Sequence, residues 1–423
     1  MTMNEVNPYE KRIYIPAIII AALGYFVDIY DLILFGVIRV QSLESIGFKG
    51  EVNTYYGEWL ISIQMLGMLL GGILWGILGD KKGRLSVLFG SIILYSVANL
   101  LNGFVNSIET YAVLRFIAGI GLAGELGAGI TLVSELMPKE TRGYGTTTIA
   151  AFGLLGGITA GLIGNYEWNF GSLENWRIAY IIGGIMGLSL LILRIGVHES
   201  GIFKKFLHSD DIKRGDFISL FTDKEKFKKY LQCITIGIPT WVAVGILILF
   251  APEFAKVLNI EVPEGEKVKA GTAVMMAYAG LTVGDIFSGV LSQLLKSRKK
   301  AVATFIILTV IFSALYLFSP NVTLETFYIF CFLIGFGAGF WAVFVTVASE
   351  NFGTNIRATA TTTVPNFVRG SVSIILPIYN FFSDLTGSII YGAFIVTLLF
   401  ASIALFSLSQ MKETFHNDLD FVE

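Results

Sequence analysis

Cysteine and histidine are scarce in this chain, whose 423 residues include two cysteines and three histidines. Cys233 and Cys331 both lie within long apolar segments and lack the spacing of metal ligands, so we expect neither a structural disulfide nor a metal site. All three histidines lie outside those segments, and no arrangement of a nucleophile with a base is recognisable. These absences argue against an enzyme, a metal centre or a bound cofactor.

Charged residues are also few. They make up 15% of the chain, against 54% for hydrophobic residues, and the formal net charge is only −2. A balance this close to zero gives no reason to expect a nucleic-acid partner. The mean hydropathy of +0.70 instead places the chain among membrane proteins. The N-terminal residues lack the apolar core of a cleaved signal peptide, so we expect the first apolar segment to stay in the lipid bilayer.

Apolar runs of roughly 20 residues recur along the chain, and each is long enough to cross a bilayer core of about 30 Å as a helix. They are too long for the strands of a membrane barrel. The sequence therefore predicts an all-α polytopic membrane protein with 12 transmembrane helices. We expect the spans at residues 13–38, 58–78, 85–105, 110–135, 143–165, 176–196, 230–251, 270–294, 301–319, 325–349, 358–382 and 387–409.

The second half of the chain repeats part of the first. Three polar residues recur with the same displacement of 215 residues, as the differences between their numbers show. These are Ser134, Glu135 and Arg142, which recur as Ser349, Glu350 and Arg357. Two similar membrane halves in one orientation are typical of transporters that work by alternating access. We expect two pseudo-symmetric six-helix bundles, at residues 1–197 and 230–423, with a solvated cytoplasmic linker at 198–229.

Lysine and arginine predict the orientation of the chain in the membrane. An even number of spans places both termini on one side, and if that side is the cytoplasm, the cytoplasmic segments hold 22 of these residues and the outer segments 6. This asymmetry follows the positive-inside rule. We expect a monomer in the plasma membrane, the inner membrane of a bacterium, with both termini in the cytoplasm.

The loop after the second span reads Gly-Ile-Leu-Gly-Asp-Lys-Lys-Gly-Arg over residues 76–84. An acid beside a basic cluster can bond across helix ends and hold one conformation of a two-state carrier. The loop resembles the signature G-x-L-x-D-[RK]-x-G-R of the major facilitator superfamily. The corresponding loop of the second half has Gln293 in place of the acid and resembles a decayed copy.

Other motifs narrow the resemblance. The first span carries Asp28 and Asp31 around an aromatic residue, and the fourth span reads R-F-x-x-G-x-x-x-x-G-E from Arg115 to Glu125. These elements resemble the metabolite:proton symporters, including sialate and proline/betaine carriers, and organic ion transporters. The fifth-helix proline motif of drug/proton antiporters is missing. The resemblance implies a proton-coupled symporter that imports a small organic anion or zwitterion, and the alternative is an uncoupled facilitator or an anion exchanger or exporter of the same fold.

Ionisable side chains deep in the membrane are costly unless paired or hydrated, so each is a functional hypothesis. Asp28 and Asp31 are three residues apart and share a helix face. Arg115 is expected at the depth of Asp31, which allows an ion pair that is either a proton switch or a permanent structural bridge. Glu125 lies deeper, where a second proton site, a substrate contact or a packed neutral acid are all open. We name Asp28, Asp31 and Glu125 as candidates for proton coupling.

Arg369 is expected near the middle of the eleventh span, after Pro365, where the helix has reason to bend. A fixed guanidinium there suits a carboxylate, so we expect a carboxylate-bearing substrate, although Asp285 or Glu125 are alternative partners. The candidate substrate contacts are Arg369, Arg115, Tyr30, Asn366, Gln64, Trp241 and Trp341. The candidate gating residues are Asp80, Arg84, Glu135, Arg142, Asp285, Glu350 and Arg357.

Overall fold

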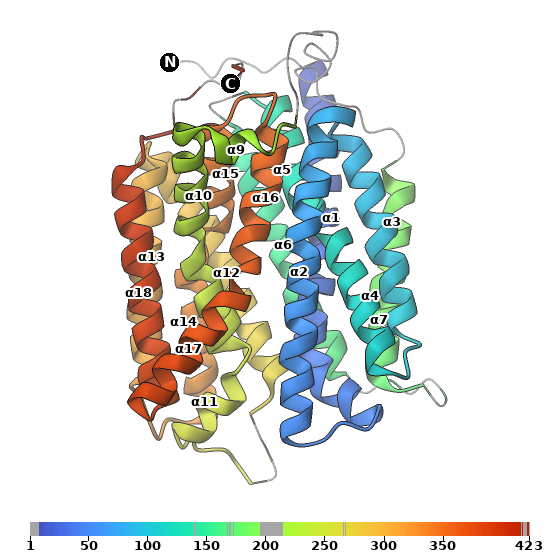
Figure 1. Ribbon diagram of the computed structural model, residues 1–423, viewed down its shortest axis with the longest axis vertical. Coiled ribbons are helices and arrows are strands. Elements are labelled where there is room, and N and C mark those ends of the chain that lie inside the picture. Colours follow the sequence, from blue (N-terminus) through green and yellow to red (C-terminus); the bar gives the residue numbers. More distant parts are fainter. Residues whose placement is uncertain are drawn as a thin grey trace.

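The computed structural model describes residues 8–138, 141–166, 168, 171, 173–194, 215–264, 266, 268–415, 417, 421 and 422. Within these residues the only β pairing is a single bridge between Glu261 and Thr323. Two groups of helices stand side by side along the long axis, the first half of the chain in blue and green and the second in yellow and red (Figure 1). The expected all-helical fold is therefore confirmed.

The helices follow the predicted spans closely. The first half contains α1 (Pro8–Ser45), α2 (Glu51–Lys82), α3 (Arg84–Asn102), α4 (Ile108–Leu122), α5 (Glu125–Leu136), α6 (Arg142–Asn165) and α7 (Asn175–Leu193). The second half contains α9 (Ser219–Thr222), α10 (Lys224–Val242), the π-helix η1 (Ala243–Ile248), α11 (Ala251–Val257), α12 (Ala270–Leu294), α13 (Arg298–Leu317), α14 (Leu324–Ala338), α15 (Trp341–Asn351), α16 (Arg357–Gly370), α17 (Val372–Thr386) and α18 (Ile389–Gln410).

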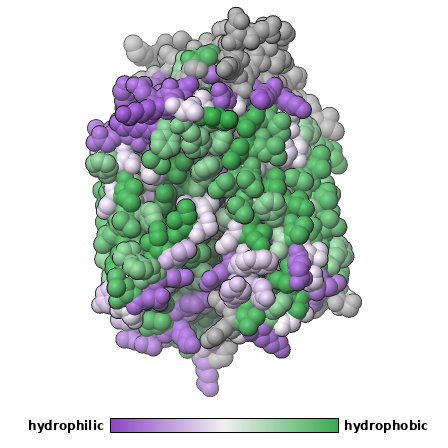
Figure 2. All heavy atoms as spheres, viewed as in Figure 1, coloured by the Kyte–Doolittle hydropathy of each residue, from purple (hydrophilic) through white to green (hydrophobic). Residues whose placement is uncertain are grey.

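The outer surface matches a membrane environment. On the face shown in Figure 2, hydrophobic side chains predominate in the middle, and hydrophilic ones are more frequent toward the two ends. Among the described residues, 11 helical segments are long and apolar enough to cross a membrane. The segment expected at 358–382 is the exception, because it consists of two helices, α16 and α17, that meet at Ser371. Helix α16 continues through Pro365 to Gly370, and the interruption of this span lies at Ser371.

Two other spans are broken near their middle. The span expected at 110–135 is α4 followed by α5, and the span expected at 325–349 is α14 followed by α15. The second members begin at Glu125 and Trp341, which are equivalent positions of the repeat. A helix that starts inside the membrane exposes backbone N–H groups, which need acceptors. Asp285 meets this need for α15, since its Oδ1 accepts a hydrogen bond of 3.0 Å from the backbone N–H of Ala342.

The described end of the linker packs on the second half. Residues 198–214 lie outside the described part of the chain. After them, Leu220 of α9 is fully buried, and the Phe217 ring lies 6.4 Å from that of Phe367. Helix α10 begins at Lys224, six residues before the span expected at 230, because Asp223 caps it. Hydrogen bonds from the backbone N–H groups of Lys226 and Glu225 lower the pKa of the Asp223 carboxyl.

The two halves meet along helices that approach closely. Helix α6 packs on α12, and α2 packs on α16. Glycine allows both contacts: a Cβ on Gly157 would clash with the Tyr278 ring, and a Cβ on Gly76 would lie 2.9 Å from the Cα of Thr359. We call the end of the molecule where α1 begins the terminal end, at the top of Figure 1. At the opposite end, Arg39 and Glu253 form an ion pair of 3.7 Å across the two halves.

Candidate functional site

A buried ion pair joins the two halves at the centre of the molecule. The Nη2 of Arg369 in α16 lies 3.7 Å from Oδ2 of Asp28 in α1, and both side chains are almost fully buried. The same Nη2 donates a hydrogen bond of 3.5 Å to the hydroxyl of Tyr25, and the guanidinium lies 5.7 Å from the centre of the Trp341 ring. Neither oxygen of Asp28 nor the Nε of Arg369 has a hydrogen-bond partner among the described residues. This pair therefore retains hydrogen-bonding capacity that a bound molecule can use.

A small cavity of about 20 Å³ adjoins this pair. Arg369, Trp241 and Trp341, three of the predicted substrate contacts, line it together with Tyr25 and Tyr278. The Nε1 of Trp341 has no hydrogen-bond partner among the described residues. About 10–15 Å³ of such volume is needed for one water, so the cavity in this conformation is much too small for an organic substrate. The halves must separate before a substrate enters.

Asn366 links the halves directly. Its Nδ2 donates hydrogen bonds of 2.9 Å to the carbonyl oxygen of Ala123, at the break between α4 and α5, and of 2.7 Å to that of Thr362. Its Oδ1 has no partner among the described residues. In this conformation the amide nitrogen of Asn366 is thus occupied by the protein itself, and its substrate role stays a prediction.

The predicted contacts Arg115, Gln64 and Tyr30 lie inside the first half instead of lining the central cavity. Arg115 donates hydrogen bonds to Oε1 of Gln64 and, at 3.4 Å, to the hydroxyl of Tyr180. Tyr30 donates to the carbonyl oxygen of Ala179 at 2.8 Å.

Arg115 also influences Asp31 electrostatically, but no ion pair within 4.0 Å joins them. The Asp31 carboxylate is fully buried and has no hydrogen-bond partner in the described part of the chain. The ion pair that the sequence allowed is therefore not formed in this structure, and the oxygens of Asp31 keep free hydrogen-bonding capacity.

Glu125 has a partner that sequence analysis missed. Arg194, just after α7, donates to Oε2 of Glu125 at 2.5 Å and to Oε1 at 3.0 Å, and the hydroxyl of Ser91 donates to the same Oε1 at 2.9 Å. The Arg194 side chain is almost completely buried, with 1% of its surface exposed. The sequence held one signal for this pair: Arg194 lies at the end of the span expected at 176–196, and the span expected at 110–135 carries the acid Glu125.

The signature loop closes the terminal end. Asp80 accepts hydrogen bonds from the backbone N–H groups of Ala358 at 3.1 Å and Thr359 at 2.8 Å, and from the Thr359 hydroxyl at 2.7 Å. These N–H groups belong to the first turn of α16, where a carboxylate also interacts favourably with the helix dipole. Arg84 lies 3.6 Å from Asp80 on the same side. A single acid of the first half thus holds a helix of the second.

Glu135 bridges cations from both halves. Its Oε1 accepts from Nη2 of Arg84 at 2.8 Å and from Nη1 of Arg357 at 3.5 Å. Both arginines are fully buried; Nη1 of Arg84 donates to the carbonyl oxygen of Gly79, and Nε of Arg357 donates to those of Ser349 and Phe352. Of the predicted gating residues, Asp80, Arg84, Glu135 and Arg357 therefore form one network. The Arg142 side chain lies outside the described part.

In the repeat of this network in the second half, an amide replaces the acid that contacts a helix end of the other half. Glu350 binds Arg298 at 3.0 Å within its own half, as Glu135 binds Arg84. Gln293 occupies the place of Asp80, and a Cβ on Gly143 at the start of α6 would clash with its amide. The neutral amide of Gln293 thus faces the start of α6, whereas the carboxylate of Asp80 faces the start of α16.

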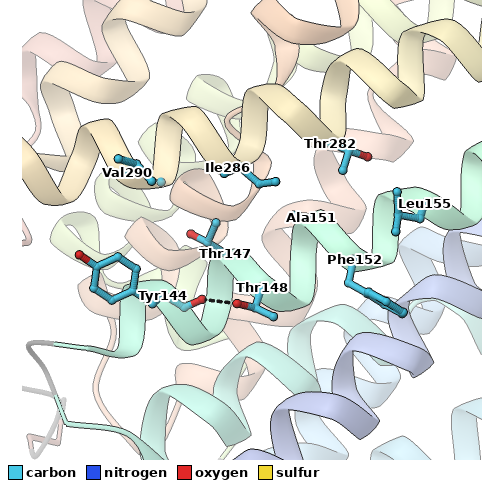
Figure 3. A pocket seen from close by; sticks show the side chains of 10 residues that line it. Tyr144, Thr147, Thr148, Ala151, Phe152, Leu155, Thr282, Ile286 and Val290 are labelled. Carbon is cyan, nitrogen blue, oxygen red and sulfur yellow. Dashed lines mark hydrogen bonds between the residues drawn. The ribbon is translucent and has the colours of Figure 1, made fainter.

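Another cavity is lined by no charged residue. It has a volume of about 380 Å³ and lies in the groove between α6 and α12, lined by apolar and threonine side chains (Figure 3). Tyr144 at its edge is 55% exposed, and no charged residue lines it. Because it has no charged group that would bind an anionic substrate, we assign the candidate site to the smaller cavity at Arg369. Among the described residues, no group of three His, Cys, Asp or Glu could hold a metal ion.

Known transporters resemble the chain in sequence. The "Cis,cis-muconate transport protein" of Acinetobacter baylyi is 29% identical over 353 residues, which cover 81% of each chain. The "Niacin transporter NiaP" of the same organism is 34% identical over 143 residues, 34% of this chain and 32% of that relative. The "Sialic acid transporter NanX" of Escherichia coli is 24% identical over 307 residues, 72% of this chain and 70% of the relative.

Solved structures share the fold. The structure of the proton:xylose symporter XylE bound to a bromodeoxyglucose aligns with a TM-score of 0.76 at 15% identity, over 97% of this chain and 98% of that one. The E. coli fucose:proton symporter FucP aligns with a TM-score of 0.72 at 15% identity, over 94% of this chain and 99% of that one. The sequence model of the Major Facilitator Superfamily matches residues 17–377. The chain belongs to the Major Facilitator Superfamily, and it is a membrane transporter and not an enzyme.

Proposed function

We propose that this transporter is a proton-coupled symporter that imports a small, carboxylate-bearing metabolite. The observation that carries the proposal is the pair of Arg369 and Asp28, which crosses the two halves beside the central cavity. Arg369 presents an N–H group without a partner among the described residues, and the aromatic rings of Trp241 and Trp341 line the same cavity. A guanidinium flanked by aromatic rings suits a planar carboxylate.

The coupling follows from competition for Arg369. A substrate carboxylate that binds Arg369 displaces Asp28 from the ion pair. If Asp28 stays ionised, it is then an unpaired anion in the core, which costs several kcal/mol. If Asp28 accepts a proton, that cost disappears, so the anion and the proton favour each other's binding. Asp31, three residues along the same helix, and Glu125 are our further candidates for proton transfer. The names of three relatives, transporters of muconate, benzoate and sialic acid, are consistent with an organic acid.

Alternating access then requires a gate at each end. We assign the inner gate to the Asp80, Arg84, Glu135 and Arg357 network, with the terminal end in the cytoplasm of a bacterial cell. The excess of lysine and arginine in the segments expected at that end supports this orientation. We further propose that residues 1–197 and 230–423 move as two bodies about the cavity, joined by the segment 198–229.

A second candidate is an uncoupled facilitator or anion exchanger. The ion pairs of Glu125 with Arg194 and Asp28 with Arg369 favour it, because each acid already has a cation and could serve structure alone. In that case the acids would stay ionised throughout the cycle, and a substrate would be exchanged for another anion.

Uptake into liposomes separates the two candidates. Purified protein would be reconstituted with a panel of radiolabelled carboxylates, with and without an inward proton gradient. A symporter accumulates its substrate only with the gradient, and an uncoupler abolishes the accumulation. Equal uptake in both conditions, with retained exchange against internal anion, would contradict proton coupling and support the second candidate.

A further inference from the structure

Helix α3 carries a row of buried polar side chains inside the first half of the molecule. Ser91, Tyr95, Asn99 and Asn102 are spaced by four, four and three residues and therefore lie on one face of the helix. Each of them is completely buried, and so is Ser96 beside them. None of these residues lines the central cavity. A polar face buried within an apolar bundle is costly unless its groups are satisfied.

Most of these polar groups have no protein partner. The Tyr95 and Ser96 hydroxyls have none among the described residues, and neither do the amide nitrogen and oxygen of Asn99 and Asn102. Buried polar atoms are nearly always hydrogen-bonded in folded proteins, and bound water serves where protein groups do not. Six orphaned atoms on one face of one helix therefore indicate a built site for water.

Glycine on the facing helix lets polar side chains pack closely against its backbone. A Cβ on Gly187 of α7 would clash with the Ser96 hydroxyl, and a Cβ on Gly183 would clash with the Asp31 carboxylate. Helix α3 packs directly against α7. The polar side of α3 and the Asp31 carboxylate thus both contact the glycine positions of α7.

The polar face lies between Asp31 and Glu125, two candidates for proton coupling that do not line the central cavity. Near one end of the row, the Ser91 hydroxyl donates to Glu125. Tyr95, the next residue of the row, interacts electrostatically with both Glu125 and Asp31. Asn99 lies next to Asp31, without the geometry of a hydrogen bond.

Charged and titratable groups face the row from the other helices as well. Asp28 and Asp31 belong to α1, Arg115 to α4 and Glu125 to α5, while Arg194 follows α7. Arg115 and Arg194 thus stand beside Asp31 and Glu125 respectively, so that a cation is available near each acid whichever of them holds the proton.

We infer that the polar face of α3 is a water-filled proton path between Asp31 and Glu125, separate from the route of the substrate. This inference rests on the proton coupling proposed above. Asp31 in its acid form gives its proton to a bound water and becomes a carboxylate beside Arg115. Water molecules and the Tyr95 hydroxyl each accept one proton and release another, and the Glu125 carboxylate takes up the last. Neutral Glu125 then binds Arg194 less strongly, which frees that end of the path to exchange protons.

The test is the Tyr95→Phe variant, which removes the hydroxyl and keeps the ring. We expect accumulation driven by a proton gradient in liposomes to fall at least tenfold, while exchange of internal for external substrate, with no gradient, stays within twofold of wild type. Asn99→Leu should show the same split. The control is Tyr230→Phe in the second half, another buried tyrosine whose hydroxyl has no partner among the described residues, and it should accumulate substrate normally.

Two failures are distinguishable. Wild-type uptake that ignores the gradient would overturn the coupling itself, whereas gradient-driven uptake that survives in both variants would overturn only the path. Radiolytic hydroxyl-radical labelling reads hydration without any transport. Tyr95 should be labelled although it is buried, and the buried Tyr316, whose hydroxyl donates to the carbonyl oxygen of Leu247, should not. Equal labelling of Tyr95 and Tyr316 would overturn the bound water.

Discussion

Arg369 is the residue on which the proposed recognition depends. It lies in a helix of the second half and faces an acid of the first, at a distance of 3.7 Å. Its charge compensates Asp28 in the absence of substrate, so removing it alone leaves a buried anion, which costs about 3–5 kcal/mol. A recognition test at this position must therefore separate lost binding from lost stability.

Replacement of Arg369 by lysine should weaken the binding of carboxylates at least tenfold. Lysine keeps the positive charge that Asp28 requires but lacks the planar fork that binds a carboxylate through two N–H groups. Calorimetric titration with a carboxylate panel measures the effect. The double variant Arg369→Ala with Asp28→Ala is the matched control for stability, and we expect it to fold without binding anions. Unchanged affinity in both variants would remove Arg369 from the substrate site.

The Asp28→Asn variant should bind carboxylates more tightly than wild type near neutral pH. The substitution removes the internal competitor for Arg369 and keeps the shape of the side chain. Wild-type affinity should rise as pH falls, because protonation discharges Asp28, and the affinity of the variant should not follow pH. Titrations between pH 5 and pH 8 test this. An unchanged pH dependence in the variant would assign the coupling to another acid.

At the scale of helices, hydropathy predicted the spans but not their interruptions. The 12 spans could be placed because long apolar runs must cross the bilayer as helices. The breaks before Glu125 and Trp341 depend on side chains of neighbouring helices that accept hydrogen bonds from the free backbone N–H groups, as Asp285 does for α15. Such contacts between distant residues leave no local pattern in the sequence. The partners of Glu125 and Asp80 were missed for the same reason, since Arg194 and the start of α16 are distant in sequence.

The Asp80→Asn variant should open the terminal end more often. It replaces the charged acceptor of the first turn of α16, where hydrogen bonds to a charged group contribute about 1.5–3 kcal/mol each. We expect a shift of roughly tenfold or more toward the open form, measured as alkylation of a cysteine introduced at Thr359, which lies in this contact. Gln293→Asp is the mirror variant and should strengthen the contact of α12 with the start of α6. Equal alkylation in wild type and Asp80→Asn would contradict a gating role.

Ionic contacts join the two halves near both ends of the molecule in this structure. The ionic network at Asp80 and Glu135 closes the terminal end, and Arg39 with Glu253 joins the halves at the opposite end. The central cavity of about 20 Å³ is too small for an organic substrate in this conformation. In the proposed cycle of alternating access, such a compact state would lie between the two open forms.

Distances across the two ends should change in opposite directions during transport. Spin labels on exposed residues report this: the pair at Lys81 and Lys300 for the terminal end, and the pair at Ser45 and Glu261 for the opposite end. Double electron–electron resonance should show that the label distance at one end lengthens as the label distance at the other end shortens when a transported carboxylate is added. A pair of labels within the first half, at Lys81 and Tyr144, should stay constant. Parallel changes at both ends would contradict the rocking of two bodies.

The ion pair of Arg39 with Glu253 differs from the network at the terminal end in its contact with solvent. The Glu253 side chain is 41% exposed, whereas those of Asp80, Arg84 and Glu135 are buried. Dissolved salt screens exposed charges that are farther apart than the Debye length, which falls from about 8 Å at physiological ionic strength to about 3 Å at 1 M, and it screens buried charges much less. The protein should therefore open at this end more readily in brine than in dilute buffer, so that the salinity of the surrounding medium tunes one gate and leaves the other unchanged.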